Sequence, residues 1–192
     1  MKVSTLALAL CAGLATSAHA EPRDDLIAAF GKAAELTRYR LDIEVENKRG
    51  PIRSRMDVQL PNRFHMKTDE AEFISIPEGT WISAAGRWMR VPMDMSRQLQ
   101  GYRLEDARKQ AEGELGEVVK LGSAEVGGCQ SERYRYTTST RYGGREREDD
   151  VEVAICTRTG LPIELRSVPR RKGETVVIRY DFEAEVNIRP PG

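Results

Sequence analysis

The stretch Val176-Val-Ile-Arg-Tyr-Asp-Phe-Glu-Ala-Glu-Val-Asn-Ile188 decides the fold class of this chain. Its apolar positions alternate with mostly charged or polar ones; they are Val176, Ile178, Tyr180, Phe182, Ala184, Val186 and Ile188. Because successive side chains of a strand point to opposite faces, the pattern predicts one long strand with an apolar face. At about 3.3 Å per residue it would be roughly 40 Å long, well above the usual strand of about 5–6 residues. Such a long apolar face must be buried against another part of the molecule or a ligand. The alternatives are a second sheet layer, helices or a bound ligand.

The same alternation recurs along the chain, with turn residues between the runs. The predicted strands cover 39–46, 52–60, 64–66, 72–76, 80–84, 87–91, 118–126, 134–142, 151–155 and 161–165. Their short spacing favours antiparallel pairing. Helical periodicity is seen at 24–36, after the capping pair Asp24-Asp25, and again at 93–101 and 104–114. We therefore expect one α+β domain, mainly antiparallel β, formed by residues 21–192.

The N-terminus is typical of a secretory signal peptide. A basic Lys2 precedes an apolar run from Val3 to Ala15, and the small residues before Ala20 suit cleavage there. Lipid attachment at Cys11 is the alternative, but it requires a small preceding residue, and Leu10 is not small. The sequence thus predicts a signal peptide over residues 1–20 and a periplasmic mature chain.

Charge and hydropathy limit the classes of partner that the sequence favours. The whole chain has 30 basic and 30 acidic residues, and loss of Lys2 with the signal peptide leaves 29 basic residues. This balance does not favour binding to nucleic acid or to acidic lipid surfaces. The mature sequence has no second apolar run long enough to span a membrane.

Two cysteines remain after signal cleavage, Cys129 and Cys156. In an oxidising compartment an even count predicts a disulfide, worth about 2–4 kcal/mol. A metal site is the alternative, but neither cysteine has a histidine nearby in sequence. Placing the cysteines opposite each other pairs Tyr134 with Val151 and puts the turn at 141–144. Both cysteines then face away from Tyr134.

Candidates for catalysis are sparse. The mature sequence has one histidine, His65, on the polar side of a predicted strand, which disfavours histidine triads and histidine-based metal sites. Acidic residues gather at 69–72 and 146–152, at predicted turns and polar faces where solvated charge is the favoured interpretation. No phosphate-binding glycine loop and no GxSxG motif occurs. We therefore expect no catalytic residues, no metal and no cofactor; a hydrolase is the least favoured hypothesis.

Six short phrases follow one another along the chain. They are Tyr39-Arg-Leu-Asp-Ile43, Leu60-Pro-Asn-Arg-Phe64, Gly79-Thr-Trp81, Gly86-Arg-Trp88, Cys156-Thr-Arg-Thr-Gly-Leu-Pro-Ile163 and Val186-Asn-Ile-Arg-Pro190. In their order these phrases resemble the LolA-like group of bacterial periplasmic proteins. The group includes lipoprotein carriers and lipid-binding lipoproteins. The resemblance implies an open, strongly curved antiparallel half-barrel, with helices forming a lid in its concavity and acyl chains held beneath them.

This resemblance also implies a ligand-lining set. Its expected members are Leu41, Ile43, Met56, Val58, Phe64, Met66 and Trp88 near the cavity, with Met95 and Leu99 on the lid. We thus expect a non-enzymatic carrier or binder of a hydrophobic ligand, such as lipid or the acyl chains of an acylated protein. The alternative is an envelope-stress sensor or structural partner that binds a protein segment through Arg170–Lys172 and Arg145–Asp150.

Overall fold

The computed structural model describes residues 21–48, 50–92, 99, 104, 115–142, 145–171 and 173–192. Its elements are α1 (Pro22–Ala34), β1 (Arg38–Asn47), β2 (Gly50–Gln59), β3 (Arg63–Thr68), β4 (Ala71–Ile76), β5 (Gly79–Ala84), β6 (Arg87–Val91), β7 (Val119–Val126), β8 (Cys129–Tyr142), β9 (Arg145–Cys156), β10 (Pro162–Pro169) and β11 (Thr175–Asp181). The predicted signal peptide lies outside the described residues, as do most of the two predicted helices after Pro92.

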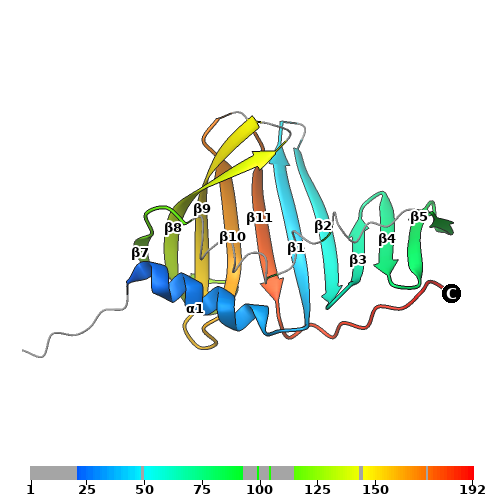
Figure 1. The fold of residues 1–192 in the computed structure, drawn as a ribbon, viewed down its shortest axis with the longest axis horizontal. Helices are drawn as coiled ribbons and strands as arrows, with labels where there is room; N and C mark the ends of the chain where they lie inside the picture. Colours follow the sequence, from blue (N-terminus) through cyan, green and yellow to red (C-terminus); the bar gives the residue numbers. More distant parts are fainter. Residues whose placement is uncertain are drawn as a thin grey trace, which may run out of the picture.

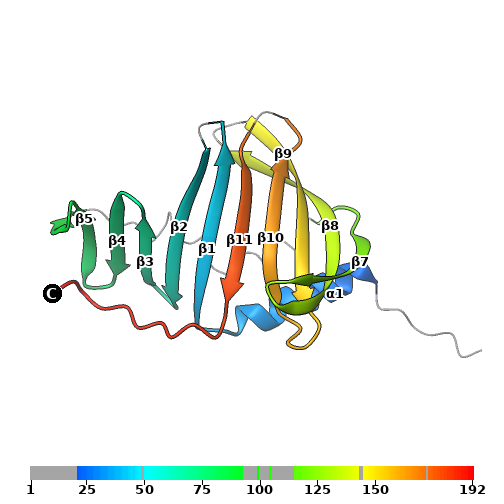
Figure 2. The same cartoon turned by 180° about the vertical axis from the view of Figure 1, so that it is seen from behind.

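All the strands form one antiparallel sheet in the order β6-β5-β4-β3-β2-β1-β11-β10-β9-β8-β7. The sheet is curved and its two edge strands, β6 and β7, do not meet (Figures 1 and 2). Helix α1 lies across the lower ends of the strands in Figure 1, on the face that we call concave. The predicted fold class, an α+β open half-barrel, is confirmed.

Helix α1 forms because its sequence suits both ends of a helix. Pro22 opens it, Asp25 and its neighbour place acidic charge in the first turn, and Lys32 places basic charge in the last. Its buried residues recur at helical spacing; they are Leu26, Ala29, Phe30 and Ala33. The Tyr134 hydroxyl of β8 donates a hydrogen bond to Asp25 Oδ2 at 2.7 Å, which fixes the helix against the sheet.

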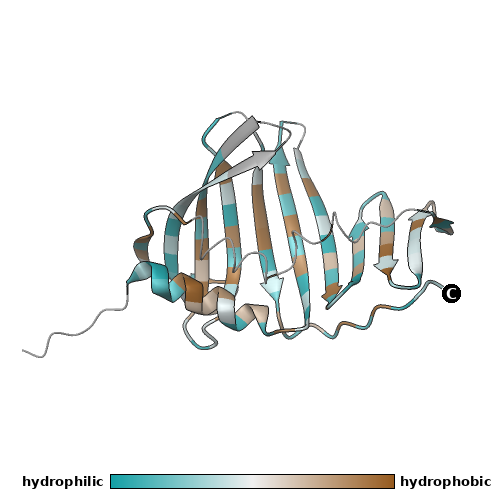
Figure 3. Cartoon of the chain, in the orientation of Figure 1, coloured by the Kyte–Doolittle hydropathy of each residue, from teal (hydrophilic) through white to brown (hydrophobic). Residues whose placement is uncertain are grey.

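The two faces of the sheet differ in composition, as the alternating bands of Figure 3 show. On the concave face, buried Tyr39, Leu41, Met56 and Val58 form a core with residues from the lid segment. On the convex face, charged side chains pair across neighbouring strands. Arg40, for example, donates to both carboxylate oxygens of Asp57, at 2.6 and 3.0 Å.

The final strand is shorter than the sequence predicts. β11 ends at Asp181, and the prediction of one strand through Ile188 is wrong beyond that residue. The Asp181 side chain accepts the Glu183 backbone N–H at 3.0 Å, as in a turn. The last residues then run as an extended tail along the lower ends of β1 to β5 (Figure 1). The tail is held where the Ile188 N–H donates to the Gln59 side chain at 3.2 Å.

This tail covers the convex face, not the concave one. Val186 and Ile188 are buried against Ile74 and Ile76 of β4. His65, opposite Ile74, alternates with the concave Phe64 and Met66, so Ile74 points away from α1. The seven apolar positions of the quoted stretch therefore do not share one face.

The predicted disulfide between Cys129 and Cys156 is confirmed, with Cα atoms 5.7 Å apart. The predicted register is wrong by two residues, because Cys156 lies opposite Ser131 and Tyr134 lies opposite Val153. A shift of two keeps every side chain on its predicted face. Both cysteines accordingly face away from Tyr134, as expected.

Candidate ligand-binding face

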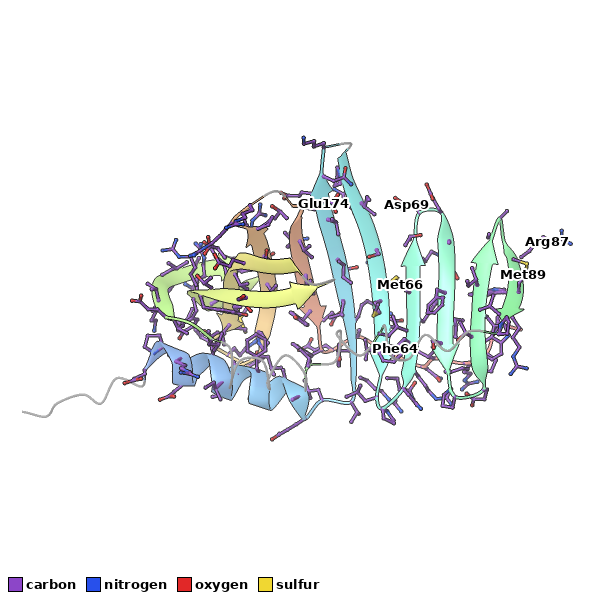
Figure 4. All side chains as sticks on the ribbon, turned by 45° about the horizontal axis from the view of Figure 1, so that its top comes forward. Phe64, Met66, Asp69, Arg87, Met89 and Glu174 are labelled. Atoms are coloured by element: carbon purple, nitrogen blue, oxygen red, sulfur yellow. A yellow bond between two sulfur atoms is a disulfide. The ribbon has the colours of Figure 1, made fainter. Side chains whose placement is uncertain are left out.

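A row of apolar side chains crosses the concave face on seven adjacent strands, from β6 to β11 through β1. Its members, each opposite the next in the strand pairing, are Met89, Ile82, Phe73, Met66, Met56, Leu41 and Tyr180. We call this set the apolar row. Neighbouring strands lie about 4.8 Å apart, so the row spans roughly 29 Å. Figure 4 shows Met66 in the middle of the sheet and Met89 near its edge.

Exposure rises along the apolar row toward the β6 edge. Met56 and Leu41 are 0% and 1% exposed, Met66 is half-buried, and Met89 is 56% exposed. The centre of the face is thus fully covered and the β6 end is open. An apolar surface that passes from buried to accessible is suited to receive the end of an apolar ligand.

The cover over the centre includes two leucines of the predicted lid. Leu99 and Leu104 are helical and buried, at 5% and 2% exposure, in the same cluster as Leu41 and Met56. Ala33, from the last turn of α1, joins that cluster. Met95, the other predicted lid residue, lies outside the described residues.

A second accessible apolar stretch lies at the end of the strands farther from α1. Val45 of β1 is opposite Ile52 on one side and Val176 on the other. Ile52 is 55% exposed, and the other two are half-buried. The concave face is therefore incompletely covered in two directions from its buried centre.

The structure gathers most of the predicted lining residues. Those in or against the central cluster are Leu41, Ile43, Met56, Val58, Phe64, Met66 and Leu99. Trp88 is placed elsewhere, against Ile74 and the C-terminal tail on the convex face. The β5–β6 turn pairs Ala84 with Arg87, so Trp88 lies opposite Ser83, and Met89 reaches the concave face instead.

Sequence reasoning did not place Phe73, Ile82 and Tyr180 in the ligand-lining set, and it selected Trp88 in preference to its neighbour Met89. A signal for Ile82 and Met89 was present in the two-residue turn at 85–86, which fixes the register of the β5–β6 hairpin and places these two residues opposite each other. Trp88 and Met89 are adjacent on β6 and point to opposite faces of the strand, and the residue expected from the resemblance is the convex one.

Besides Tyr39 and Tyr134, the concave side carries Tyr136 and Tyr180. Burial raises the pKa of Tyr136 to about 12. Burial, together with the nearby Tyr136 and Tyr39, holds the pKa of Tyr180 above its ordinary value. Both phenols therefore stay protonated at neutral pH, as an ordinary tyrosine also does.

The convex face holds His65, the one histidine within residues 21–192. His65 Nε2 lies 3.6 Å from Glu72 Oε2 and has no hydrogen bond, while Lys67 Nζ lies 2.8 Å from Glu72 Oε1. The hydrogen bond from Lys67 lowers the pKa of Glu72.

In the described ranges, histidine, cysteine and acidic side chains do not gather in threes as a metal site requires. Nor does any helix among these residues combine the length and apolar character needed to cross a membrane.

Comparison with known proteins identifies the fold. The structure superposes on the crystal structure of the lipoprotein LppX from Mycobacterium tuberculosis with a TM-score of 0.68, covering 88% of this chain and 98% of that one at 10% identity. For LprF from Mycobacterium bovis the TM-score is 0.66, with 88% and 96% covered at 12% identity. The fold is LolA-like. No family model and no curated protein sequence matches the chain.

The LolA-like fold confirms the resemblance seen in the sequence. At these identities the similarity concerns the fold alone, so the ligand has to be argued from this chain's own residues. The apolar row, the lid leucines and the open β6 end are the features available for that argument.

Proposed function

We propose that this protein is a periplasmic, non-enzymatic carrier or binder of a hydrophobic ligand with acyl chains. The observation that carries the proposal is the apolar row, which is continuous over seven strands and grows more exposed toward Met89. An ordinary protein core would be covered along its whole length. A row covered at its centre and open at one end supports a chain-shaped ligand that enters from the β6 edge.

Affinity in such a site comes from removing apolar surface from water. Burial contributes about 25 cal/mol per Å², from which the ordering of the ligand subtracts. Methionine suits this role because its flexible thioether adapts to ligands of different shape. The row contains three methionines, Met56, Met66 and Met89, spread from the buried centre to the open end.

The compartment follows from the signal-peptide pattern at residues 1–20, and the absence of enzymatic activity remains a prediction. A carrier needs neither a catalytic group nor a metal. The ligand-lining set of the proposal is the central cluster together with Phe73, Ile82, Met89 and Tyr180, and it leaves out Trp88.

The proposal is tested by binding. Mature protein, residues 21–192, is purified from the periplasm, and its organic extract is analysed by mass spectrometry. The delipidated protein is then titrated with a pyrene-labelled hydrocarbon. We expect co-purified acyl lipid and saturable probe binding; a protein that is empty and does not bind the probe would refute carriage.

A matched pair of variants locates the site. Met89→Lys places a charge on the open end of the apolar row, at a position whose 56% exposure tolerates lysine. It should weaken probe binding about tenfold, since one apolar contact of this size is worth about 1.5 kcal/mol. Val168→Lys is the control, because Val168 is also exposed, at 39%, but lies on the convex side opposite Asp150. Equal affinities for both variants would place the ligand elsewhere.

A further inference from the structure

The concave positions of β3 to β6 carry a single charged residue, Arg87. These positions are Phe64, Met66, Thr68, Ala71, Phe73, Ser75, Thr80, Ile82, Ala84, Arg87, Met89 and Val91. Aspartate and glutamate do not occur among them, so this half of the concave face combines an apolar surface with one positive charge that no carboxylate of the same strand face balances.

Arg87 lies beside the open end of the apolar row. It is two residues from Met89 on β6, so both side chains point to the same face, with Cα atoms roughly 7 Å apart. Both are exposed, and Figure 4 shows them together at the edge of the sheet. A chain-shaped ligand that enters over Met89 therefore passes the Arg87 guanidinium.

The other cation of β6 shows what a structural arginine does here. Arg90 is on the convex face, where it donates to the Glu78 carbonyl oxygen at 2.7 Å and lies over the Trp81 ring at 5.6 Å. The side chain of Arg87 forms neither an ion pair nor a hydrogen bond with any residue that the structure describes. Its charge is thus not used to hold the described strands together.

The chemistry of a guanidinium defines the group that would bind there. It donates two parallel hydrogen bonds to a carboxylate or a phosphate, and these charge-assisted bonds are stronger than bonds between neutral groups. Because Arg87 is exposed, an anion beside it keeps part of its water and avoids the cost of burying a charge. One cation acts on one bound molecule, whereas the balanced net charge of the chain gives no attraction to an acidic membrane surface.

We propose that Arg87 binds the anionic head group of an acyl ligand whose chain lies along the apolar row. The inference rests on the proposed function and specifies its ligand class as an amphiphile with a carboxylate or phosphate head. The head group stays at the β6 edge, and the chain extends from Met89 toward Met66.

Three probes with the same pyrene-labelled chain test this assignment: a fatty acid, an alkyl phosphate and a fatty-acid methyl ester, all at pH 8. Arg87→Gln should lower the affinity for an anionic probe about fivefold, which is the size of one exposed charge pair, and leave the affinity for the ester unchanged. A loss for the fatty acid alone supports a carboxylate head group, a loss for the alkyl phosphate alone supports a phosphate, and a loss for both supports either anion. High salt should reduce the difference between the wild type and the variant.

Arg90→Gln is the matched control, because it removes the same charge from the same strand on the opposite face. Its affinity for the anionic probes relative to the ester should equal that of the wild type, and circular dichroism checks that both variants are folded. Unchanged affinity of Arg87→Gln for both anions, an equal loss for all three probes, or the same anion-specific loss in both variants would overturn the role of Arg87 while leaving carriage intact. Failure of all three probes to bind the wild type would refute carriage itself.

Discussion

The two ends of the sheet are covered on opposite faces. At the β8–β10 end, α1 buries Leu26 and Phe30 against the concave side. At the β4–β6 end, the C-terminal tail buries Val186 and Ile188 against the convex side, and the concave side there exposes Met89. One end thus resembles an ordinary helix-on-sheet core, whereas the other leaves its concave surface accessible. An apolar face can thus stay open at one end of the sheet when a different segment covers the back of the same strands.

The largest loss of stability is expected from a substitution in α1, where the helix covers the sheet. Phe30 is 2% exposed and packs with Tyr134 and Val153, so Phe30→Ala should lower the free energy of unfolding by about 3–5 kcal/mol. Urea denaturation followed by tryptophan fluorescence and circular dichroism measures this change. Ala28→Gly, at an exposed position of the same helix, is the control and should cost only about 1 kcal/mol. Equal losses would mean that α1 is held by its helix propensity and not by its cover of the sheet.

The tail should matter less for stability, and not at all for binding. Ile188 is 5% exposed on the convex side, and Ile188→Ala should cost about 2 kcal/mol. Hydrocarbon probe affinity should stay within about twofold of wild type, because Met89 and Ile188 lie on opposite faces. Asn187→Ala, at the exposed neighbouring position, should be silent in both assays. A loss of probe affinity in Ile188→Ala would break the distinction between the two faces.

The smallest expected effect on stability concerns the ion pair between Lys67 and Glu72, which lies on the convex face. The hydrogen bond from Lys67 lowers the pKa of Glu72 in the folded chain below its ordinary value of 4.5. A carboxyl with a lowered folded pKa stabilises the fold above its ordinary pKa, and this stabilisation is lost as the pH falls through the folded value. The pair is partly exposed, so its contribution is below about 1 kcal/mol.

Lys67→Met should therefore reduce stability slightly at pH 7 and very little at pH 3. Thermal unfolding of both proteins across this range measures the difference, and high salt should reduce it further. Arg55→Met, which breaks the exposed pair with Asp42 at 2.8 Å, is the comparison on the neighbouring strand. A difference between Lys67→Met and wild type that grows as the pH falls would contradict the sign of the Glu72 effect.

Much of the fold followed from local patterns. Alternation at 39–46 and 52–60, with the turn between them, predicts the β1–β2 hairpin that the structure contains. The two cysteines predicted the faces of β8 and β9, although the register of the pair differed by two residues. The face to which each side chain points could be predicted, because moving one strand past its partner by two residues leaves every side chain on the same face. The register itself depends on contacts between the strands, which the alternation within one strand does not specify.

The predicted lining residues lie on the concave face where neighbouring strands repeat the same alternation. Leu41, Met56 and Met66 follow from strands whose faces are marked by strong alternation. Trp88 was expected on this face from the resemblance, and it is half-buried, but on the convex face. Its exposed neighbour Met89 faces the concave side. The resemblance did not distinguish these two adjacent residues.

The sequence by itself determined the strands, their turns, the disulfide and the amphipathic helix, because these depend on periodicity and on the conformational preferences of nearby residues. Only the tertiary structure decided which face of each strand is covered and by which segment. Alternation continues past Asp181 without a break, yet the chain leaves the sheet there, and Val186 and Ile188 find their partners on β4. Burial is a contact between segments distant in sequence, so a pattern within one segment specifies that a face is apolar without specifying what covers it.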